Sequence, residues 1–309
     1  MVLLTGASGM LGRYVKDMLD ESVLTLGRSE GNDFRVNLER AVPDFGNRKF
    51  SLIIHCAGTE DDVRADVLNV GGTQNLLRAL DAFPPQYFVY ISSWQVYSAD
   101  GGENISEDAN TWATTPAGMS KARAEREVAA WACRHGVTLT ILRPARMFGN
   151  GVAGETLSLF NDAVSGKYIH IRGNDSRLSI VTAYDTARAA LLLYGKGGIY
   201  NIADGRNPRF IEMVEAMTAN IGMKKRMTHL PANWAEWLWR LGRWIPSIER
   251  NLNPSIVENR MKTLTLDNSK VEEATGLKFF NTIDVIERVA EDYPYESDKP
   301  KENLHANEV

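Results

Sequence analysis

The fold of this chain is decided by the stretch Thr5-Gly6-Ala7-Ser8-Gly9-Met10-Leu11-Gly12, which directly follows the apolar segment Met1 to Leu4. A strand that runs through a glycine turn into a helix is the pattern that seats a dinucleotide pyrophosphate at a helix N-terminus. A tight turn without a ligand is the alternative interpretation. We therefore predict cofactor contacts from Gly6, Ser8, Gly9, Met10, Leu11 and Gly12.

The second apolar segment of the chain ends at Leu26-Gly27-Arg28-Ser29. At this place an NAD-specific fold offers a carboxylate to the hydroxyls of the adenosine ribose. Arg28 and Ser29 offer charge-assisted hydrogen bonds to a 2'-phosphate instead. The sequence therefore favours NADP(H) over NAD(H), and a solvated loop arginine is the alternative role of Arg28.

Apolar runs typical of strands alternate with helical patterns through the first two-thirds of the 309 residues. Some runs, such as Leu52-Ile53-Ile54, are continuously apolar, as expected of strands covered on both faces. This order predicts an α/β fold with a doubly wound, Rossmann-type parallel sheet. The predicted strands are Met1 to Thr5, Ser22 to Leu26, Phe34 to Leu38, Leu52 to Cys56, Tyr87 to Ser92, Thr138 to Arg143 and Ile199 to Ile202.

After Arg143-Pro144 the rhythm breaks into loops rich in glycine and asparagine, and from Asp204 onward the pattern is mainly helical. Pro231, Pro246 and Pro254 punctuate that helical part. We predict a smaller, mostly helical C-terminal substrate domain. The expected division is an NADP-binding Rossmann domain over 1–148 and 178–204, a substrate-binding domain over 149–177 and 205–295, and a disordered tail over 296–309.

The composition is that of a soluble globular protein, with 44% apolar residues, 24% charged residues and a formal net charge of −4. This charge gives no general attraction for nucleic acid, so we expect no nucleic-acid partner. Cys56 lies in an apolar strand pattern and Cys133 in a helical pattern, which predicts two buried thiols in a reducing compartment. The five histidines lack metal-ligand spacing, so we predict no metal.

The chain starts directly with its first strand, which leaves no room for a secretion signal, and no apolar run approaches the roughly 20 residues of a transmembrane segment. We therefore expect a cytoplasmic protein.

Six further stretches are similar to motifs of the extended short-chain dehydrogenase/reductase family, the NAD(P)-dependent epimerase/dehydratase group that acts on nucleotide sugars. They occur in the order of that family and span most of the chain, roughly residues 1 to 290. They are Ile54-His55-Cys56-Ala57-Gly58, Asn69-Val70-Gly71-Gly72-Thr73-Gln74-Asn75-Leu76-Leu77, Tyr90-Ile91-Ser92-Ser93-Trp94-Gln95-Val96-Tyr97, Leu142-Arg143-Pro144 with Phe148-Gly149, Tyr200-Asn201-Ile202-Ala203-Asp204-Gly205, and Asp267-Asn268-Ser269-Lys270 with Thr275-Gly276-Leu277.

The resemblance implies roles for two residues at the reacting centre. Ser93 would hydrogen-bond the reacting oxygen of the substrate, and Lys121 would bind the nicotinamide ribose and lower the pKa of a catalytic tyrosine. Further cofactor contacts that the resemblance implies come from Asn37, Leu38, Cys56, Ala57, Gly58, Ser92 and Pro144.

The stretch Pro116-Ala117-Gly118-Met119-Ser120-Lys121 resembles the helix that carries the catalytic tyrosine and lysine in that family. Its tyrosine position holds Ala117. Thr115 as cap and Pro116 at the first helical position predict a helix start, and positions 117 and 121 then share one helix face. Because alanine carries no ionisable group, acid-base catalysis worth about 10²- to 10⁴-fold should be lost while ligand binding survives. Either the alanine is engineered, which we favour, or the natural protein gave up catalysis. Substitution by another tyrosine, Tyr97 being the nearest, is the third alternative.

The expected activity of the parent enzyme is NADP(H)-dependent oxidation, reduction or epimerisation at a keto or hydroxyl carbon of a nucleotide sugar. The resemblance is strongest to proteins of bacterial surface-polysaccharide synthesis that handle 4-keto-6-deoxy sugar nucleotides. The alternatives are a noncatalytic NADP-binding sensor and a dehydrogenase of the 3-beta-hydroxysteroid type, which the C-terminal segment also resembles.

The substrate contacts are expected from polar residues near strand ends and on loops, where arginines can clamp a diphosphate. Arg172 and Arg206 belong to the same loop group. The predicted set is Ser93, Gln95, Arg143, Arg146, Arg177 and Arg209.

The segment that contains Trp234, Trp237, Leu238, Leu241 and Ile245 has near-helical apolar spacing, and arginines lie within it. We interpret it as a packing helix of the substrate domain or as part of the contact of a homodimer, which we expect. A weak contact with a membrane surface is the alternative.

Overall fold

The computed structural model describes residues 1–19, 23–97, 101–152, 154–219 and 227–291. Its largest element is a seven-stranded sheet in which every adjacent pair is parallel, in the order β11-β7-β5-β4-β1-β2-β3. The strands are β1 (Val2–Thr5), β2 (Val23–Gly27), β3 (Phe34–Arg35), β4 (Leu52–His55), β5 (Tyr87–Ile91), β7 (Thr138–Pro144) and β11 (Gly198–Ile202). The predicted doubly wound sheet is confirmed, with a shorter third strand at its edge.

The strand order reverses at β1, which pairs with β2 on one side and with β4 on the other. Thr5 at the end of β1 lies opposite Leu26 and His55. In parallel sheets of this kind, ligands bind in the crevice beyond the carboxyl ends of the strands at such a reversal. The glycine turn follows β1 directly, so it lies at this place.

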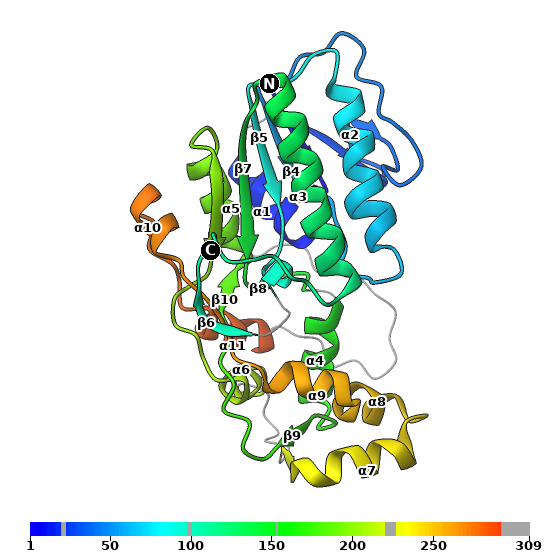
Figure 1. Cartoon of the computed structure of the whole chain (residues 1–309), viewed down its shortest axis with the longest axis vertical. Helices are drawn as coiled ribbons and strands as arrows, with labels where there is room; N and C mark the ends of the chain where they lie inside the picture. The colour runs from blue at the N-terminus through cyan, green and yellow to red at the C-terminus, as the bar shows by residue number, and fades with distance from the viewer. Residues whose placement is uncertain (20–22, 98–100, 153, 220–226, 292–309) are drawn as a thin grey trace.

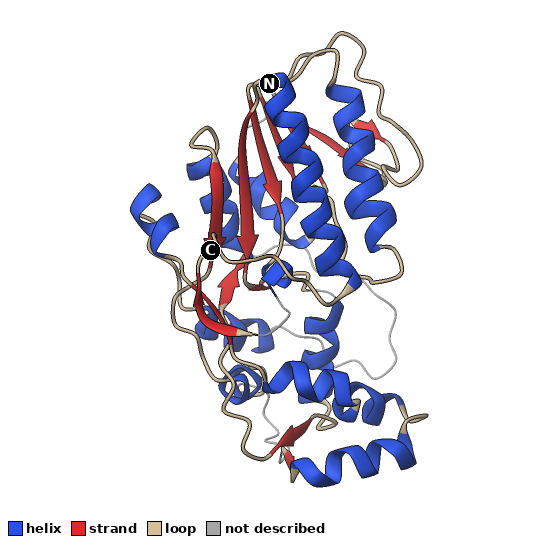
Figure 2. Ribbon diagram, in the orientation of Figure 1, coloured by secondary structure: helices blue, strands red, loops and turns tan. Residues whose placement is uncertain are grey.

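Helices cover both faces of the sheet (Figures 1 and 2). Alternate residues of each strand point to opposite faces, so Leu4 packs with α1 (Met10–Met18) and α5 (Ala183–Leu193), whereas Leu3 packs with α2 (Thr73–Leu80) and α3 (Pro116–His135). Burial on both faces is why these strands are continuously apolar in sequence.

Most of the remaining described elements gather beyond the carboxyl edge of the sheet, in the lower half of Figure 1. Three small parallel pairs join distant segments: β10 with β8, β12 with β9, and β13 with β6. The elements are η1 (Asp66–Gly72), η2 (Trp94–Tyr97), β6 (Gly102–Ile105), β8 (Arg146–Phe148), α4 (Gly154–Val164), β9 (Ile169–Ile171), β10 (Ile180–Thr182), α6 (Phe210–Ala216), β12 (Thr228–Leu230), α7 (Ala232–Gly242), α8 (Pro246–Leu252), α9 (Pro254–Met261), β13 (Leu264–Leu266), α10 (Ser269–Thr275) and α11 (Thr282–Glu291). Two of these lie elsewhere: η1 packs against α3, and α10 packs against α5 and β11.

The prolines of the C-terminal part stand where helices begin. Pro246 and Pro254 are the first residues of α8 and α9, and Pro231 is the N-cap of α7. Proline suits the first helical turn because its missing N–H has no partner there. The division into two domains at the predicted bounds remains a prediction, and the tail over 296–309 lies outside the described residues.

One sequence expectation needs correction. Cys133 is exposed and Cys56 is only partly buried, so the predicted pair of buried thiols is wrong. Helix α7 packs through Ala235, Leu238 and Trp239, whereas Trp234 and Trp237 of the predicted apolar face are more than half exposed. None of the described helices is long and apolar enough to cross a bilayer.

Candidate active site

The glycine turn after β1 is dictated by close backbone packing. Gly6 has a φ of +71°, and a Cβ there would lie 2.7 Å from the backbone nitrogen of Ala57. A Cβ on Gly12 would overlap the carbonyl oxygen of Gly6. Only glycine fits at both positions. The turn can therefore pack against the backbone that follows β4, and α1 can pack against the turn.

The N-terminus of α1 is open toward this crevice. Gly9 is the N-cap residue, and in the described part of the chain no side chain caps this helix. Ser8 and Gly9 are exposed, and Met10 is half-buried. The first N–H groups of α1 are therefore available to an anion, as phosphate binding requires.

The end of β2 presents a cation, Arg28, whereas the nearby carboxylates of Glu30 and Asp33 bond within the protein, to Arg35 and to Thr25. Arg28 and Ser29 are exposed directly after the strand. The carboxylate of Asp33 accepts hydrogen bonds from the backbone N–H and the hydroxyl of Thr25, at 2.8 and 2.9 Å, and the backbone bond lowers the pKa of Asp33. Asp33 is thus held against β2, and Arg28 is left to meet a ligand.

The other predicted cofactor residues line the same edge of the sheet, and several of them are partly used within the protein. Leu38 is buried and its carbonyl accepts from Asn75, while the side chain of Asn37 accepts from the N–H of Glu39. Burial raises the pKa of Cys56 to about 12, so its thiol stays protonated. The remaining members are Ala57, Gly58, Ser92 and Pro144, at the ends of β4, β5 and β7.

Helix α3 begins as predicted and packs tightly against η2. The Thr115 hydroxyl accepts from the N–H of Gly118 at 3.1 Å, and Pro116 is the first helical residue. A Cβ on Gly118 would lie 2.5 Å from the carbonyl oxygen of Gln95, so a larger residue has no room. This contact brings the first turn of α3 against the segment that contains Ser93.

Lys121 is buried and reaches the end of β5. Its Nζ donates to the carbonyl of Ile91 at 2.8 Å and lies 5.2 Å from the centre of the Tyr90 ring. Loss of hydration lowers the pKa of Lys121 to about 8. A Cβ on Gly58 would lie 2.6 Å from this ammonium group, so a larger residue there would displace the end of the lysine side chain.

A polar network fixes α3 to the loop after β4. Asn69 donates to the Ser120 hydroxyl at 2.9 Å and accepts from the N–H of Thr59, and the Ser120 hydroxyl donates to the carbonyl of Ala117. Ser93 is buried, and its hydroxyl accepts from the N–H of Gln95 at 3.2 Å. The structure therefore brings Ser93 and Lys121 to one edge of the sheet.

Ala117 is buried on the first turn of α3, one helical turn before Lys121, and its N–H donates to Asp62 at 3.1 Å. Tyr97 does not replace a tyrosine at 117. Its hydroxyl donates to Asn201 at 2.9 Å and accepts from Arg143 at 2.6 Å, in a buried network away from the pocket. The hydroxyl of Tyr97, the nearest candidate for the third alternative, is therefore committed to partners within the protein.

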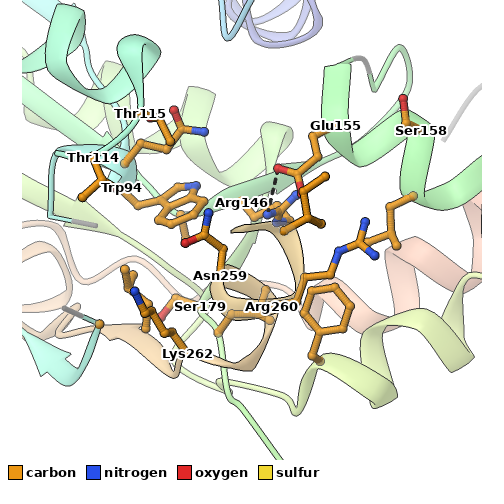
Figure 3. Close-up of a pocket in the computed structure, with 18 of the residues that line it drawn as sticks. Trp94, Thr114, Thr115, Arg146, Glu155, Ser158, Ser179, Asn259, Arg260 and Lys262 are labelled. Carbon is orange, nitrogen blue, oxygen red and sulfur yellow. Dashed lines mark ion pairs between the residues drawn. The ribbon is translucent and has the colours of Figure 1, made fainter. Parts of the chain in front are cut away.

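A cavity of about 380 Å³ opens beyond Ser93 between the sheet edge and α4, α8 and α9 (Figure 3). Its walls include predicted residues, Gln95 and Arg146, and many that were not predicted. The chief lining residues are Asp62, Trp94, Gln95, Thr114, Thr115, Arg146, Glu155, Asp162, Leu178, Ser179, Phe210, Arg250, Asn259, Arg260 and Lys262.

The cations of this pocket come from segments far apart in the chain. Arg146 lies 3.5 Å from Glu155, and Arg260 lies 5.9 Å from the ring centres of both Tyr168 and Phe210. The Nε groups of Arg146 and Arg260 are buried without a hydrogen-bond partner among the described residues. Unsatisfied guanidinium donors beside a cavity are suited to an anionic ligand. Burial also lowers the pKa of Arg260.

Arg143 is not placed to bind substrate. Its guanidinium donates to both carboxylate oxygens of Glu125, at 3.0 and 2.6 Å, and to Tyr97 and the carbonyl of Glu107, and it is buried. Its donors are committed within the protein, so we replace the predicted substrate role with a structural one.

Arg177 and Arg209 also turn away from the pocket. They form an isolated bridge, Arg177 donates to the carbonyl of Asn207, and Arg209 pairs with Glu212 at 3.0 Å. Their chain neighbours Leu178 and Phe210, the latter the first residue of α6, line the pocket instead. Arg172 and Arg206 are exposed and lie outside the pocket wall as well.

Known proteins are similar to this chain in sequence. The model of the NAD dependent epimerase/dehydratase family matches residues 2–203. The chain is 25% identical over 312 residues to a UDP-glucose 4-epimerase of Vibrio cholerae, covering 90% of each protein. It is 24% identical over 255 residues to an N-acetyl-alpha-D-glucosaminyl-diphospho-ditrans,octacis-undecaprenol 4-epimerase of Escherichia coli O157:H7, covering 74% of this chain and 75% of that protein.

The fold is also shared with solved structures. RMD from Pseudomonas aeruginosa complexed with NADPH superposes with a TM-score of 0.70 at 21% identity, covering 94% of this chain and 99% of that one. The resemblance read from the motifs is confirmed by a family match that spans well over half of the chain. The chain belongs to the NAD dependent epimerase/dehydratase family.

Proposed function

We propose that this chain binds NADP(H) and a nucleotide sugar in the site of an oxidoreductase or epimerase that acts at a keto or hydroxyl carbon of the sugar. The specific reaction we propose for the tyrosine-bearing form is reduction of a 4-keto-6-deoxy sugar nucleotide in surface-polysaccharide synthesis. The observation that carries the proposal is that Lys121 donates to the carbonyl of Ile91 at the end of β5, two residues before Ser93, on the sheet edge that also carries the glycine turn. Trp94 and Gln95, which follow Ser93, line the pocket.

In this proposal each residue of the site has a separate role in binding. The Ser93 hydroxyl hydrogen-bonds the reacting oxygen, the Lys121 ammonium holds the nicotinamide ribose, and Arg146 and Arg260 bind the diphosphate. A bound nicotinamide supplies or accepts the hydride. Ala117 neither gives nor takes a proton, so this polypeptide holds both ligands without efficient turnover.

The preference for NADP(H) rests on Arg28 and Ser29, since the family name alone covers NAD-dependent members. Titration of cofactor fluorescence with NADPH and NADH tests it. Loss of a charge-assisted hydrogen bond is worth roughly 1.5–3 kcal/mol, so Arg28→Ala should weaken NADPH binding about 10- to 150-fold and leave NADH unchanged. Arg35→Ala is the matched control, because Arg35 is an exposed arginine on the neighbouring strand that pairs with Glu30. Equal affinity of the wild type for both cofactors would contradict the preference.

A sugar diphosphate fits the pocket better than a steroid does. The walls carry Arg146, Arg250, Arg260 and Lys262 beside Asp62, Glu155 and Asp162. The Nε groups of Arg146 and Arg260, which have no partner among the described residues, favour an anion, whereas a steroid needs an uncharged apolar cleft. Both curated relatives are named for sugar diphosphates, one attached to uridine and one to a polyprenol. A thermal-shift series with NADPH present should show stabilisation by UDP-sugars and by UDP, and none by the free sugar. Stabilisation by a sterol alone would favour the steroid alternative.

A noncatalytic NADP-binding sensor is the second candidate, and the buried Ala117 is the observation that favours it. Such a protein would bind both ligands with the same residues. The two candidates predict different results for Ala117→Tyr: turnover is restored if the protein is an inactivated enzyme, and it is not restored if the protein is a sensor.

A further inference from the structure

Four cations line the pocket in the described part of the chain, and two of them are each neutralised by a carboxylate of their own. Arg250 donates to both carboxylate oxygens of Asp162, at 3.0 and 2.8 Å. The Lys262 ammonium lies 3.0 Å from the carboxylate of Glu258, one helical turn earlier. Because these two charges are compensated within the protein, the attraction of the pocket for an anion must come mainly from the other two cations.

The other two cations, Arg146 and Arg260, are held in place by neutral groups. Arg146 donates to the Thr156 hydroxyl at 3.2 Å, and Arg260 donates to the side-chain oxygen of Asn251 at 3.2 Å. Their buried Nε groups have no hydrogen-bond partner among the described residues. A neutral acceptor satisfies an N–H group but leaves the positive charge uncompensated, so both guanidinium groups still need a counterion.

Glu155, the second residue of α4, is the carboxylate that these two guanidinium groups share. It lies 3.5 Å from Arg146, and Figure 3 shows this ion pair together with Arg260 on the pocket wall. Arg146 and, more weakly, Arg260 hold the pKa of Glu155 below its ordinary value. Burial lowers the pKa of Arg260, and the charge of Glu155 opposes that change. One carboxylate therefore compensates two cations that would otherwise repel each other.

The neighbouring carboxylates are not placed to do the same. Asp62 accepts a hydrogen bond from the N–H of Ala117 at the start of α3. Glu60 lies outside the pocket wall, and loss of hydration, which outweighs the attraction of Arg146, raises its pKa. The Glu155 side chain, by contrast, is 53% exposed, so a ligand can displace it into solvent with little loss of packing.

We propose that Glu155 is a built-in counterion of Arg146 and Arg260, and that a diphosphate must displace it in order to bind. This inference rests on the proposed function and assigns Glu155 a role in setting the affinity of the pocket for anions. A diphosphate brings at least two negative charges to guanidinium groups that already face one, so the carboxylate is repelled as the ligand enters. Glu155 therefore lowers the affinity for a diphosphate while it stabilises the two arginines of the pocket.

Calorimetry of the full chain with UDP, inorganic diphosphate and uridine tests the displacement. Glu155→Gln keeps the shape of the side chain and an acceptor oxygen toward Arg146, but it removes the charge. The variant should bind UDP and inorganic diphosphate about tenfold more tightly at low salt, with a smaller gain at high salt and no gain for uridine. Adding Arg260→Gln to this variant should reduce the gain, which would place the effect in the pocket.

The same substitution should have the opposite effect on the protein alone. Glu155→Gln should lower the midpoint of urea unfolding, because the charges of Arg146 and Arg260 then repel each other without a counterion. Glu236→Gln is the matched control for both measurements, since Glu236 is an exposed glutamate that pairs with Arg240 on α7, outside the pocket wall. It should match the wild type in ligand affinity and in stability.

Two results would overturn the inference. One is a Glu155→Gln protein that binds both phosphate ligands no more tightly than the wild type, since Glu155 would then only position the arginines. The other is an equal gain in Glu236→Gln, since net charge would then explain the effect. Failure of the proposed function would look different: UDP would bind no better than inorganic diphosphate, while Glu155→Gln still tightened binding of the latter. If neither protein bound either anion, both proposals would be contradicted.

Discussion

The cofactor edge of the sheet and the pocket beyond it are built in different ways. At the cofactor edge the geometry is set by backbone: Gly6, Gly12 and Gly118 stand where a Cβ has no room, each next to a strand end or helix start. In the pocket it is set by side chains, Arg146 and Arg260 among them, that are more than a hundred residues apart in the chain. Local sequence motifs therefore predict the cofactor edge well and the pocket poorly.

The largest effect is expected from a comparison of Arg143 with Arg146, one arginine bonded within the protein and one on the pocket wall. Arg143→Ala leaves the Glu125 carboxylate buried without its partner, which should cost about 3–5 kcal/mol of unfolding free energy in urea titrations. Arg146→Ala should leave the unfolding free energy within about 1 kcal/mol and weaken UDP-sugar binding instead. If the Arg143 variant is as stable as the wild type, its structural role is wrong. The double variant Arg143→Ala with Glu125→Ala should recover part of the loss, because no charge is then left buried.

The buried lysine predicts a pH dependence at the cofactor edge. The pKa of Lys121 is lowered to about 8 in the folded chain, below the usual value of 10.5, so between these pH values the unfolded chain binds more protons. Unfolding free energy should therefore rise with pH over that window, by roughly 3 kcal/mol at most, in the wild type relative to Lys121→Met. The difference should be flat below pH 8. Parallel pH profiles of the two proteins would refute the burial of a protonatable lysine.

The glycine turn offers a matched pair of substitutions. Gly12→Ala forces a Cβ onto the Gly6 carbonyl and should lower the unfolding free energy by about 1–3 kcal/mol and weaken NADPH binding. Gly71→Ala meets its nearest atom at 3.9 Å and should be tolerated. Chemical denaturation with NADPH titration distinguishes them. Equal stability of the two variants would show that the turn is not packed as described.

The smallest effect separates pocket cations from surface cations. Arg260→Gln removes a buried guanidinium from the pocket wall and should weaken UDP binding by roughly 2 kcal/mol, about thirtyfold, in calorimetry. Arg177→Gln should change nothing, because that arginine faces solvent and the Asn207 carbonyl. If Arg177→Gln weakened UDP binding more than Arg260→Gln did, the diphosphate would be bound by the loop arginines predicted from the sequence.

Sequence reasoning succeeded where a residue is constrained by its neighbours in the chain. All seven strands of the main sheet were predicted, because strands buried on both faces are rich in apolar residues and some, such as Leu52–His55, are almost continuously apolar. The edge strand Phe34–Arg35 is shorter than predicted. The start of α3 was predicted from Thr115 and Pro116, because a helix cap and a proline at the first helical position are adjacent in the sequence.

The pocket could not be predicted in full, because contacts between distant segments leave no local pattern. Nothing near Arg260 distinguishes it from a surface arginine at the end of an exposed helix. Arg143 was misjudged because its partner Glu125 lies 18 residues earlier, on α3. The spacing of the tryptophans indicated a helix face correctly, but helical spacing alone does not say whether a face is covered.

The central claim is that this site is complete except for a proton donor at position 117. The direct measurement is NADPH consumption with a 4-keto-6-deoxy nucleotide sugar by Ala117→Tyr, beside Ala117→Phe, which adds the same ring without the hydroxyl. We predict that the tyrosine variant turns over about 10²- to 10⁴-fold faster than both the wild type and the phenylalanine variant. A tyrosine variant that is folded, binds both ligands and is no faster than the phenylalanine variant would contradict the claim.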